Sequence, residues 1–291
     1  MSMDLLHDKI RKLKNPSVID FGIKADNLPP HLLDEEGSLA KAYGRFCREL
    51  MTALKGIVPA VRFPFGAFAL LGAEGMDTLQ SLLREAKEME YFVFLDSPEI
   101  LSPWAADRTA DTICKEDCFP CDALVISSFI GSDGFKPFLP YCKDGSKALF
   151  VVVRTPNKSA SELQDLLTGT RFAHFATSEI VNRFGEPILA KCGYSRMGLV
   201  ASASAPDSLR NLRSRHNRMF LLVDGLDYPS GNAKNCSGAF DRFGYGAVVC
   251  AGPSVTAAWQ ETEGDGKDYL TEAVQAAERM KKNITRYVTV F

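Results

Sequence analysis

Short apolar runs that end directly in Gly, Ser, Asp, Asn or Thr recur along this chain. Runs of this kind predict β-strands, because apolar β-formers followed by turn-forming residues mark strand ends. The clearest pair lies between Ala123 and Leu166, in ALVISSFIGSDGFKPF and ALFVVVRTPNKSASELQDL. Eight strands are expected: Ser17–Asp20, Ala60–Phe63, Tyr91–Asp96, Ala123–Ser127, Ala148–Arg154, Met197–Ala203, Met219–Val223 and Ala247–Ala251.

Stretches of helical period separate these strands. Apolar residues repeat on one face of the predicted helices Ser38–Leu54, Met76–Met89, Ser178–Ala190 and Tyr269–Lys282. Strands that alternate with helices indicate a parallel sheet covered on both faces. Eight such units predict a single-domain (β/α)8 TIM barrel over residues 1–291, with a C-terminal helix at about 269–282. The rival is an open doubly wound sheet, but no Gly-x-Gly-x-x-Gly motif follows the first strand, so nothing supports dinucleotide binding.

Composition agrees with one large core. The 291 residues are 46% hydrophobic, and a single barrel of about 250 residues is typical of this fold. The net charge is −2, and neither sign forms long blocks, so no nucleic-acid or membrane partner is expected. No apolar run approaches the ~20 residues of a membrane span, and the N-terminal residues lack a signal-peptide core. A cytoplasmic protein is expected.

Several polar residues at strand ends are candidates for function, and each has a structural alternative. Asp96 is a candidate functional carboxylate or an ordinary turn residue. Ser132 and Asp133 fit a ligand loop, although Asp133 also fits an N-cap for a helix at 135–142. Arg154 is expected to be ion-paired rather than ligand-bound. The histidines are isolated in sequence, and none indicates a base or a metal ligand; they are His7, His31, His174 and His216.

The eight cysteines are expected to be reduced thiols. Cys114, Cys118 and Cys121 nevertheless have the spacing of the cluster motif of radical S-adenosylmethionine enzymes, and with Cys142 they would suffice for zinc. That radical motif follows the first strand, whereas this segment precedes the fourth. Unligated thiols and no cofactor are therefore expected, with a metal or Fe–S site as the alternative.

Ordered sequence motifs relate the chain to a known family. They are Lys14-Asn15-Pro16-Ser17-Val18, Val58-Pro59-Ala60-Val61, Gly131-Ser132-Asp133-Gly134 with Lys136-Pro137-Phe138, Thr155, Asn157 and Ser159 before Gln164-Asp165-Leu166, and Cys192-Gly193-Tyr194-Ser195 with Gly198. In these positions the chain resembles the longer bacterial orotidine 5'-phosphate decarboxylases over nearly its whole length. The resemblance implies a barrel, a carbon–carbon lyase and the UMP-forming step of pyrimidine biosynthesis.

The same resemblance indicates that catalytic positions are substituted. The family places alternating Lys and Asp side chains after its second and third strands, where a lysine protonates the carbanion-like carbon left by CO₂. Here Asp96 matches the first carboxylate. Pro98 stands at the acid lysine, and Leu101 replaces an Asp that the family lends across its dimer interface. Arg62 replaces the second-strand lysine, and an arginine is a poor proton donor.

Binding positions differ as well. Gly22 and its neighbours replace the first-strand Leu-Asp-Pro, and Pro156 stands at a serine that reads the pyrimidine. Pro229 and Pro253 replace the phosphate-binding Gln and Arg, and proline offers no donor. The substrate contacts that the resemblance still implies are Thr155, Asn157, Ser132 and Gly231.

Taken together, these substitutions predict a degenerate homologue that has lost decarboxylation. It is expected to bind a nucleotide-like small molecule, to act in binding or regulation, and to form a homodimer, as the family does. One alternative is an active decarboxylase with a rearranged site, using Lys24 or Lys158 as the acid. The other is a metal or Fe–S protein that uses Cys114, Cys118 and Cys121.

Overall fold

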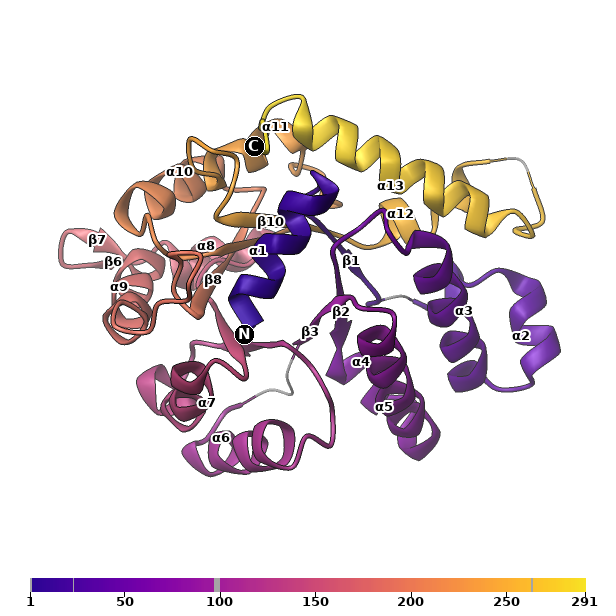
Figure 1. Ribbon diagram of the computed structural model, residues 1–291, viewed down its shortest axis with the longest axis horizontal. Coiled ribbons are helices and arrows are strands. Elements are labelled where there is room, and N and C mark those ends of the chain that lie inside the picture. Colours follow the sequence, from indigo (N-terminus) through magenta and orange to yellow (C-terminus); the bar gives the residue numbers. More distant parts are fainter. Residues whose placement is uncertain (1, 23, 97–99, 263) are drawn as a thin grey trace.

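A closed barrel of eight parallel strands forms the centre of the molecule (Figure 1). This computed structural model describes residues 2–22, 24–96, 100–262 and 264–291. Around the barrel the strands follow the order β1-β10-β9-β8-β5-β4-β3-β2. The strands are β1 Ser17–Asp20, β2 Ala60–Pro64, β3 Phe92–Asp96, β4 Ala123–Ser127, β5 Ala148–Val152, β8 Met197–Ser202, β9 Leu221–Asp224 and β10 Ala247–Ala251. The predicted (β/α)8 barrel and its eight strands are confirmed, with strand ends shifted by two residues or fewer.

Helices surround the barrel. The α-helices are α1 Ser2–Leu13, α2 Pro30–Glu36, α3 Leu39–Leu54, α4 Phe65–Ala69, α5 Gly72–Glu88, α6 Pro103–Thr109, α7 Leu139–Asp144, α8 Ser161–Gln164, α9 Ala173–Gly185, α10 Pro206–Arg215, α11 Ala233–Cys236, α12 Pro253–Thr256 and α13 Tyr269–Thr285. The shorter helical turns are η1 Ala25–Asn27, η2 Ala110–Lys115, η3 Gly131–Gly134, η4 Lys136–Phe138, η5 Lys158–Ala160, η6 Ser237–Ala239 and η7 Ala258–Glu261. A hairpin of β6 Leu167–Thr168 and β7 Arg171–Phe172 lies between α8 and α9.

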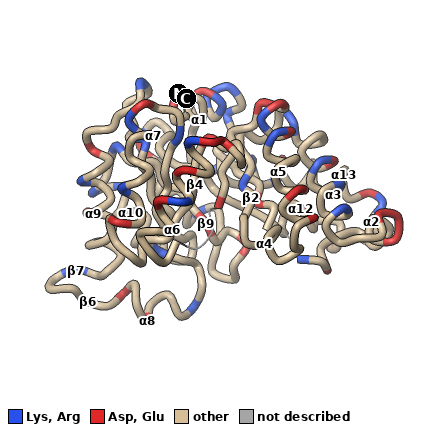
Figure 2. The backbone as a smooth tube through the Cα atoms, turned by 90° about the horizontal axis from the view of Figure 1, so that it is seen from below, with Lys and Arg blue, Asp and Glu red and all other residues tan. Residues whose placement is uncertain are grey.

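Two apolar cores hold these layers together. The inner core fills the barrel with large aromatic side chains, among them Phe94, Phe150 and Phe220. Helix α1 contributes Met3, Leu6 and Ile10 to the same core and so closes the N-terminal end of the barrel. The outer core lies between the strands and the surrounding helices. Figure 2 shows α1 at one end of the molecule and α8 with the β6–β7 hairpin at the other.

Two local predictions were wrong. The helix expected at Ser178–Ala190 is α9, which begins at Ala173 and ends at Gly185. It ends there because Pro187, two residues later, has no N–H to continue the helix, and the Ser195 hydroxyl donates to the Gly185 carbonyl at 2.8 Å. Asp133 is not an N-cap; it lies inside η3 and binds Lys136 Nζ at 2.9 Å.

Lys, Arg, Asp and Glu residues are interspersed along the chain, with no long block of one sign (Figure 2). Within the described residues, no helix combines the length and the hydropathy that a membrane crossing requires.

Candidate functional site at the barrel mouth

Arg62 lies at the C-terminal end of the barrel, among carboxylates from three other strands. It belongs to β2, and its Nη1 atom lies 3.2 Å from Asp224 Oδ2 at the end of β9. Its other partners are Asp20, at 3.4 Å, and Asp96. Because all eight strands are parallel, their C-terminal ends meet at one end of the barrel, where chemistry is located in this fold. The predicted pair of Arg62 and Asp96 is thus brought together, as an ion pair.

The charges in this cluster do not balance. Arg62 is 8% exposed, and three carboxylates face its single guanidinium. Burial opposes its charge, but the three carboxylates outweigh that effect and hold the pKa of Arg62 well above its ordinary value. Burial raises the pKa of Asp20 to about 6, and the Asp224 charge adds to the rise while Arg62 opposes it. An additional anion at this point therefore meets carboxylates on every side of the one buried cation.

A cleft of about 400 Å³ opens above this cluster. Its lining includes Lys24 from the loop after β1 and Tyr228 and Pro229 from the loop after β9. Of the described residues that line it, Arg62 and Lys24 are the cations. The volume falls within the range of small-molecule sites, about 300–1,000 Å³.

Asp227 lines the part of the cleft where barrels commonly bind phosphate, after the last two strands. Its Oδ2 atom accepts the backbone N–H of Gly252 at 2.6 Å. The next residue, Pro253, has no N–H and begins the four-residue α12. A backbone donor that faces this corner is therefore already satisfied by a carboxylate of the same chain.

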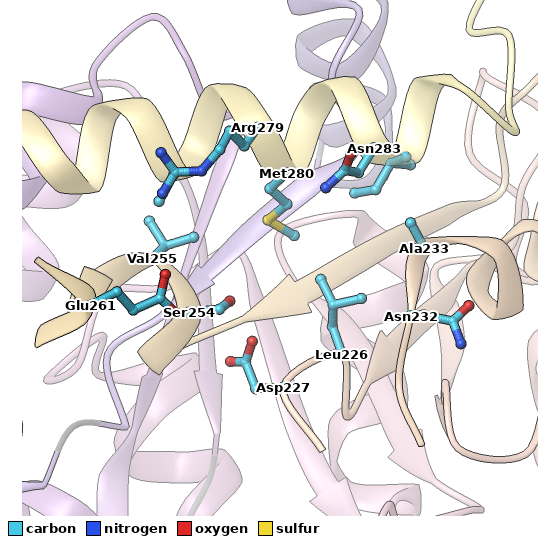
Figure 3. Close-up of a pocket in the computed structure, with 12 residues that line it drawn as sticks. Leu226, Asp227, Asn232, Ala233, Ser254, Val255, Glu261, Arg279, Met280 and Asn283 are labelled. Carbon is cyan, nitrogen blue, oxygen red and sulfur yellow. The ribbon is translucent and has the colours of Figure 1, made fainter. Parts of the chain in front are cut away.

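A second cavity, of about 390 Å³, adjoins the first on the outside of the barrel. It lies between α13, α12 and the loop after β9, and Figure 3 shows Met280 pointing from α13 toward the loop that carries Leu226. Leu226 and Asp227 line both cavities. Asp227 thus stands at the boundary between the mouth and this outer cavity.

The four predicted substrate contacts lie elsewhere in the structure, and their role stays a prediction. The described residues that line the mouth cleft do not include Thr155, Asn157, Ser132 or Gly231. The Thr155 hydroxyl accepts from Gln164 Nε2 at 2.8 Å, whereas Asn157 is exposed. Ser132 is half-buried in η3. Gly231 belongs to a tight turn, because an added Cβ would lie 2.0 Å from the Gly225 carbonyl.

The remaining sequence candidates have clear positions. Pro98 lies outside the described residues, whereas Leu101 is described and is exposed. Arg154 is ion-paired with Asp165 at 2.8 Å, as expected. Pro253 lines the mouth cleft.

The cysteine segment is packed into the barrel wall. Cys114 and Cys121 are buried and Cys118 is half-buried. Burial raises the pKa of both buried thiols to about 12, so they are protonated at neutral pH. In the described parts of the chain, no group of three or more His, Cys, Asp or Glu side chains is arranged to hold a metal ion. The metal and Fe–S alternative gains no support here.

Three carboxylates of the mouth were missed from the sequence: Asp20, Asp224 and Asp227. Asp20 and Asp224 each end a buried strand, in SVID and LLVD, and that position alone marks them as mouth residues. The sequence around Asp227 marks it less clearly as a mouth residue, because its contact with Gly252 depends on how two loops pack together.

Comparison with known proteins identifies the family. No family model matches the chain. It is 31% identical over 249 residues to the orotidine 5'-phosphate decarboxylase of Rhodopirellula baltica, covering 81% of this chain and 82% of that protein. The Clostridium novyi enzyme of the same name is 23% identical and covers 98% of both chains. The crystal structure of Plasmodium berghei orotidine 5'-monophosphate decarboxylase has the same fold, with a TM-score of 0.79, 12% identity and coverage of 98% of this chain and 97% of that one. This chain therefore belongs to the orotidine 5'-phosphate decarboxylase family.

Proposed function

We propose that this chain is a single-domain member of its family that has lost decarboxylation and acts as a binding or regulatory protein. The observation that carries the proposal is the state of Arg62, which is buried and bound by Asp20, Asp96 and Asp224. Decarboxylation of orotidine monophosphate needs a cation that stabilises a carbanion and then protonates it. Arg62 keeps its proton and is surrounded by carboxylates, so it fits neither task.

The phosphate side supports the same proposal. The Asp227 carboxylate already accepts the hydrogen bond of the Gly252 N–H, and Pro253 has no N–H to donate. A phosphate dianion placed in this corner would lose that amide and would meet the carboxylate instead. The mouth cleft therefore favours a ligand that carries no phosphate charge at this corner.

The first experiment measures release of labelled CO₂ from carboxyl-labelled orotidine monophosphate by the purified chain. No turnover above the uncatalysed rate is expected, because loss of one charge-stabilising donor typically costs 10²–10³ in rate and several are substituted. Turnover at an enzymatic rate would overturn the proposal.

The same assay tests the active alternative. Lys24 lines the mouth cleft, whereas Lys158 lies in η5 outside it, so Lys24 is the stronger candidate for a replacement acid. If turnover is found, its loss in Lys24→Met, with retention in the exposed control Lys136→Met, would establish a rearranged site.

A second experiment tests phosphate exclusion. Protection of the chain by UMP and by inorganic phosphate is measured by thermal shift, and none is expected for the wild type. Asp227→Ala frees the Gly252 amide and removes a charge, so phosphate protection is expected to appear. Asp227→Asn removes the charge but keeps an acceptor at the amide, so it is expected to gain less. Protection of the wild type at micromolar UMP would contradict an occluded corner.

We further propose a homodimer that buries the mouth end. Large apolar side chains are exposed in the segments that follow three consecutive strands: Leu70 after β2, Leu101 and Trp104 after β3, and Phe129 after β4. Apolar groups gathered at one end of a barrel favour burial against a partner.

A further inference from the structure

His174, which is isolated in the sequence, has an acid on one side and a hydroxyl on the other in the folded chain. Its Nδ1 atom lies 3.2 Å from Asp165 Oδ1 and 2.8 Å from the Gln164 carbonyl oxygen. Its Nε2 atom lies 3.2 Å from Ser208 Oγ. Asp165 follows α8, His174 is in the first turn of α9, and Ser208 is in the first turn of α10. The order along the contacts is therefore acid, imidazole, hydroxyl.

These contacts assign the histidine tautomer. Both neighbours of Nδ1 are acceptors, so Nδ1 must carry the proton. Nε2 then has a free lone pair and accepts the hydrogen bond of the Ser208 hydroxyl. This is the tautomer in which a serine is deprotonated by histidine while a carboxylate holds the ring. Burial lowers the pKa of His174, which favours the neutral ring at neutral pH.

Asp165 is itself held in place. Arg154 Nη2 binds its other oxygen, Oδ2, at 2.8 Å, and Arg154 Nη1 binds the side chain of Gln164 at 3.1 Å. These bonds fix the carboxylate beside the imidazole, as positioning residues do in serine hydrolases.

The first turn of α10 leaves backbone N–H groups beside Ser208 without a partner in the helix. Helix α10 begins at Pro206, and the Leu209 N–H bonds back to the Ala205 carbonyl at 3.1 Å. Asp207 and Ser208 come before Leu209 in the chain, so their N–H groups lie at the N-terminal end of the helix. That end stabilises negative charge. A serine whose own N–H is unused by the helix combines nucleophile and oxyanion donor at one residue.

The neighbouring surface is apolar. The β6–β7 hairpin and the segment before it, which includes the end of α8, expose large apolar side chains: Leu163, Leu166, Leu167 and Phe172. The Phe172 ring stacks on the His174 ring with centroids 5.8 Å apart. The hairpin projects from the body in both views (Figures 1 and 2). An apolar surface beside a serine–histidine pair fits the acyl part of an ester.

A second serine–histidine contact in the same region provides a comparison. Ser178 Oγ lies 2.9 Å from His216 Nε2, but Ser178 is fully buried and donates to the Phe175 carbonyl. His216 Nδ1 has no hydrogen-bond partner among the described residues. That pair has neither the acid nor the access that a nucleophile needs, whereas Ser208 is half-buried and has both an acid and a base in line.

We propose that Ser208, His174 and Asp165 form a second site, distinct from the barrel mouth, that hydrolyses esters of apolar carboxylic acids. Ser208 Oγ bonds to the ester carbonyl carbon as its proton passes to His174 Nε2. Collapse breaks the bond to the alcohol oxygen, and the alcohol leaves with that proton. Water then attacks the acyl-serine by the same route, which releases the carboxylic acid and restores the serine.

The test uses the full chain, a fluorophosphonate that labels activated serines, and p-nitrophenyl butyrate as the ester. One phosphonyl group per chain is expected, located at Ser208 by peptide mass mapping. Ser208→Ala is expected to lose labelling and hydrolysis. The control Ser214→Ala removes an exposed serine of the same helix and is expected to keep both.

Asp165→Asn separates catalysis from packing, because it keeps the shape of the side chain and disturbs the tautomer. A decrease on the order of 10²-fold or more in labelling rate is expected, with the fold retained by circular dichroism. Labelling is also expected to fall as the pH drops below the lowered pKa of His174. No adduct, an adduct at another residue, or equal rates in Ser208→Ala would overturn the proposal.

Discussion

At the scale of single residues, Arg62 and Asp227 set the charges at the mouth. Arg62 is the buried cation of the cluster, and three carboxylates already pair with it. Asp227 satisfies a backbone donor at the corner where phosphate would be expected. Both effects act against anionic ligands, and they come from side chains on different strands and loops.

Asp20 makes a testable contribution to stability. Its pKa is raised in the folded chain from 3.8 to about 6, so the folded state binds this proton more tightly than the unfolded state does. The resulting stability is fully present below pH 3.8 and is lost as the pH rises through 6. A pKa rise of about two units corresponds to a pH-dependent change of about 3 kcal/mol in the free energy of unfolding.

Asp20→Asn removes this titration while keeping an acceptor for the Gly22 N–H. The variant is expected to gain stability over the wild type as the pH rises from 5 to 8, by on the order of 1 kcal/mol. Urea unfolding at both pH values measures the difference. The exposed control Asp8→Asn should show no such change, and an equal pH slope for wild type and Asp20→Asn would refute the assignment.

At the scale of elements, the strands position the site and the loops supply its chemistry. The inner core is packed around bulky aromatic rings, and β8 makes room for one of them with Gly198. A Cβ added there would lie 2.4 Å from the Phe150 ring and 2.8 Å from the Phe220 carbonyl oxygen. Packing of the Phe150 ring against β8 therefore requires glycine at position 198.

Gly198→Ala is therefore expected to lower the free energy of unfolding by about 1–3 kcal/mol, the usual cost of overpacking. Chemical denaturation followed by circular dichroism measures the loss. Gly66→Ala is the matched control, because a Cβ at that position meets no atom within 4 Å. Equal stability of the two variants would show that the barrel absorbs the extra methyl group.

At the scale of the whole molecule, the two ends of the barrel differ. Helix α1 closes the N-terminal end with Met3, Leu6 and Ile10. The mouth end instead exposes large apolar side chains, including Trp104 at 72% and Phe129 at 79%. This asymmetry supports the proposal that a homodimer buries the mouth end.

Trp104→Asp is expected to shift the protein from dimer to monomer in sedimentation velocity, because it places a charge in the proposed interface. Its melting temperature at low protein concentration should change little, since the side chain is exposed. Phe243→Asp is the control, because Phe243 is half exposed and precedes β10 at the opposite end. A wild type that is monomeric at all concentrations would exclude the proposed dimer.

The sequence determined the architecture and part of the site. Apolar runs followed by turn residues located all eight strands. This was possible because a strand is recognised from neighbouring residues, and because strands and helices alternate along this chain. Family motifs located Arg62 and Asp96. The same local reasoning missed Asp20, which ends a predicted strand, and Asp224, which directly follows one. It also placed α9 five residues too late, although Pro187 marks the end of that helix in the sequence.

Tertiary structure alone decided which polar groups meet. Arg62 and Asp224 are 162 positions apart, and His174 and Ser208 are 34 apart. No periodicity connects such pairs, because their contact is fixed by closure of the barrel and by the way loops pack over it. The sequence by itself therefore determined the barrel and predicted substitutions at its mouth. The folded chain decided that Asp227 accepts from a backbone amide at that mouth, and that a histidine isolated in the sequence lies between an acid and a serine.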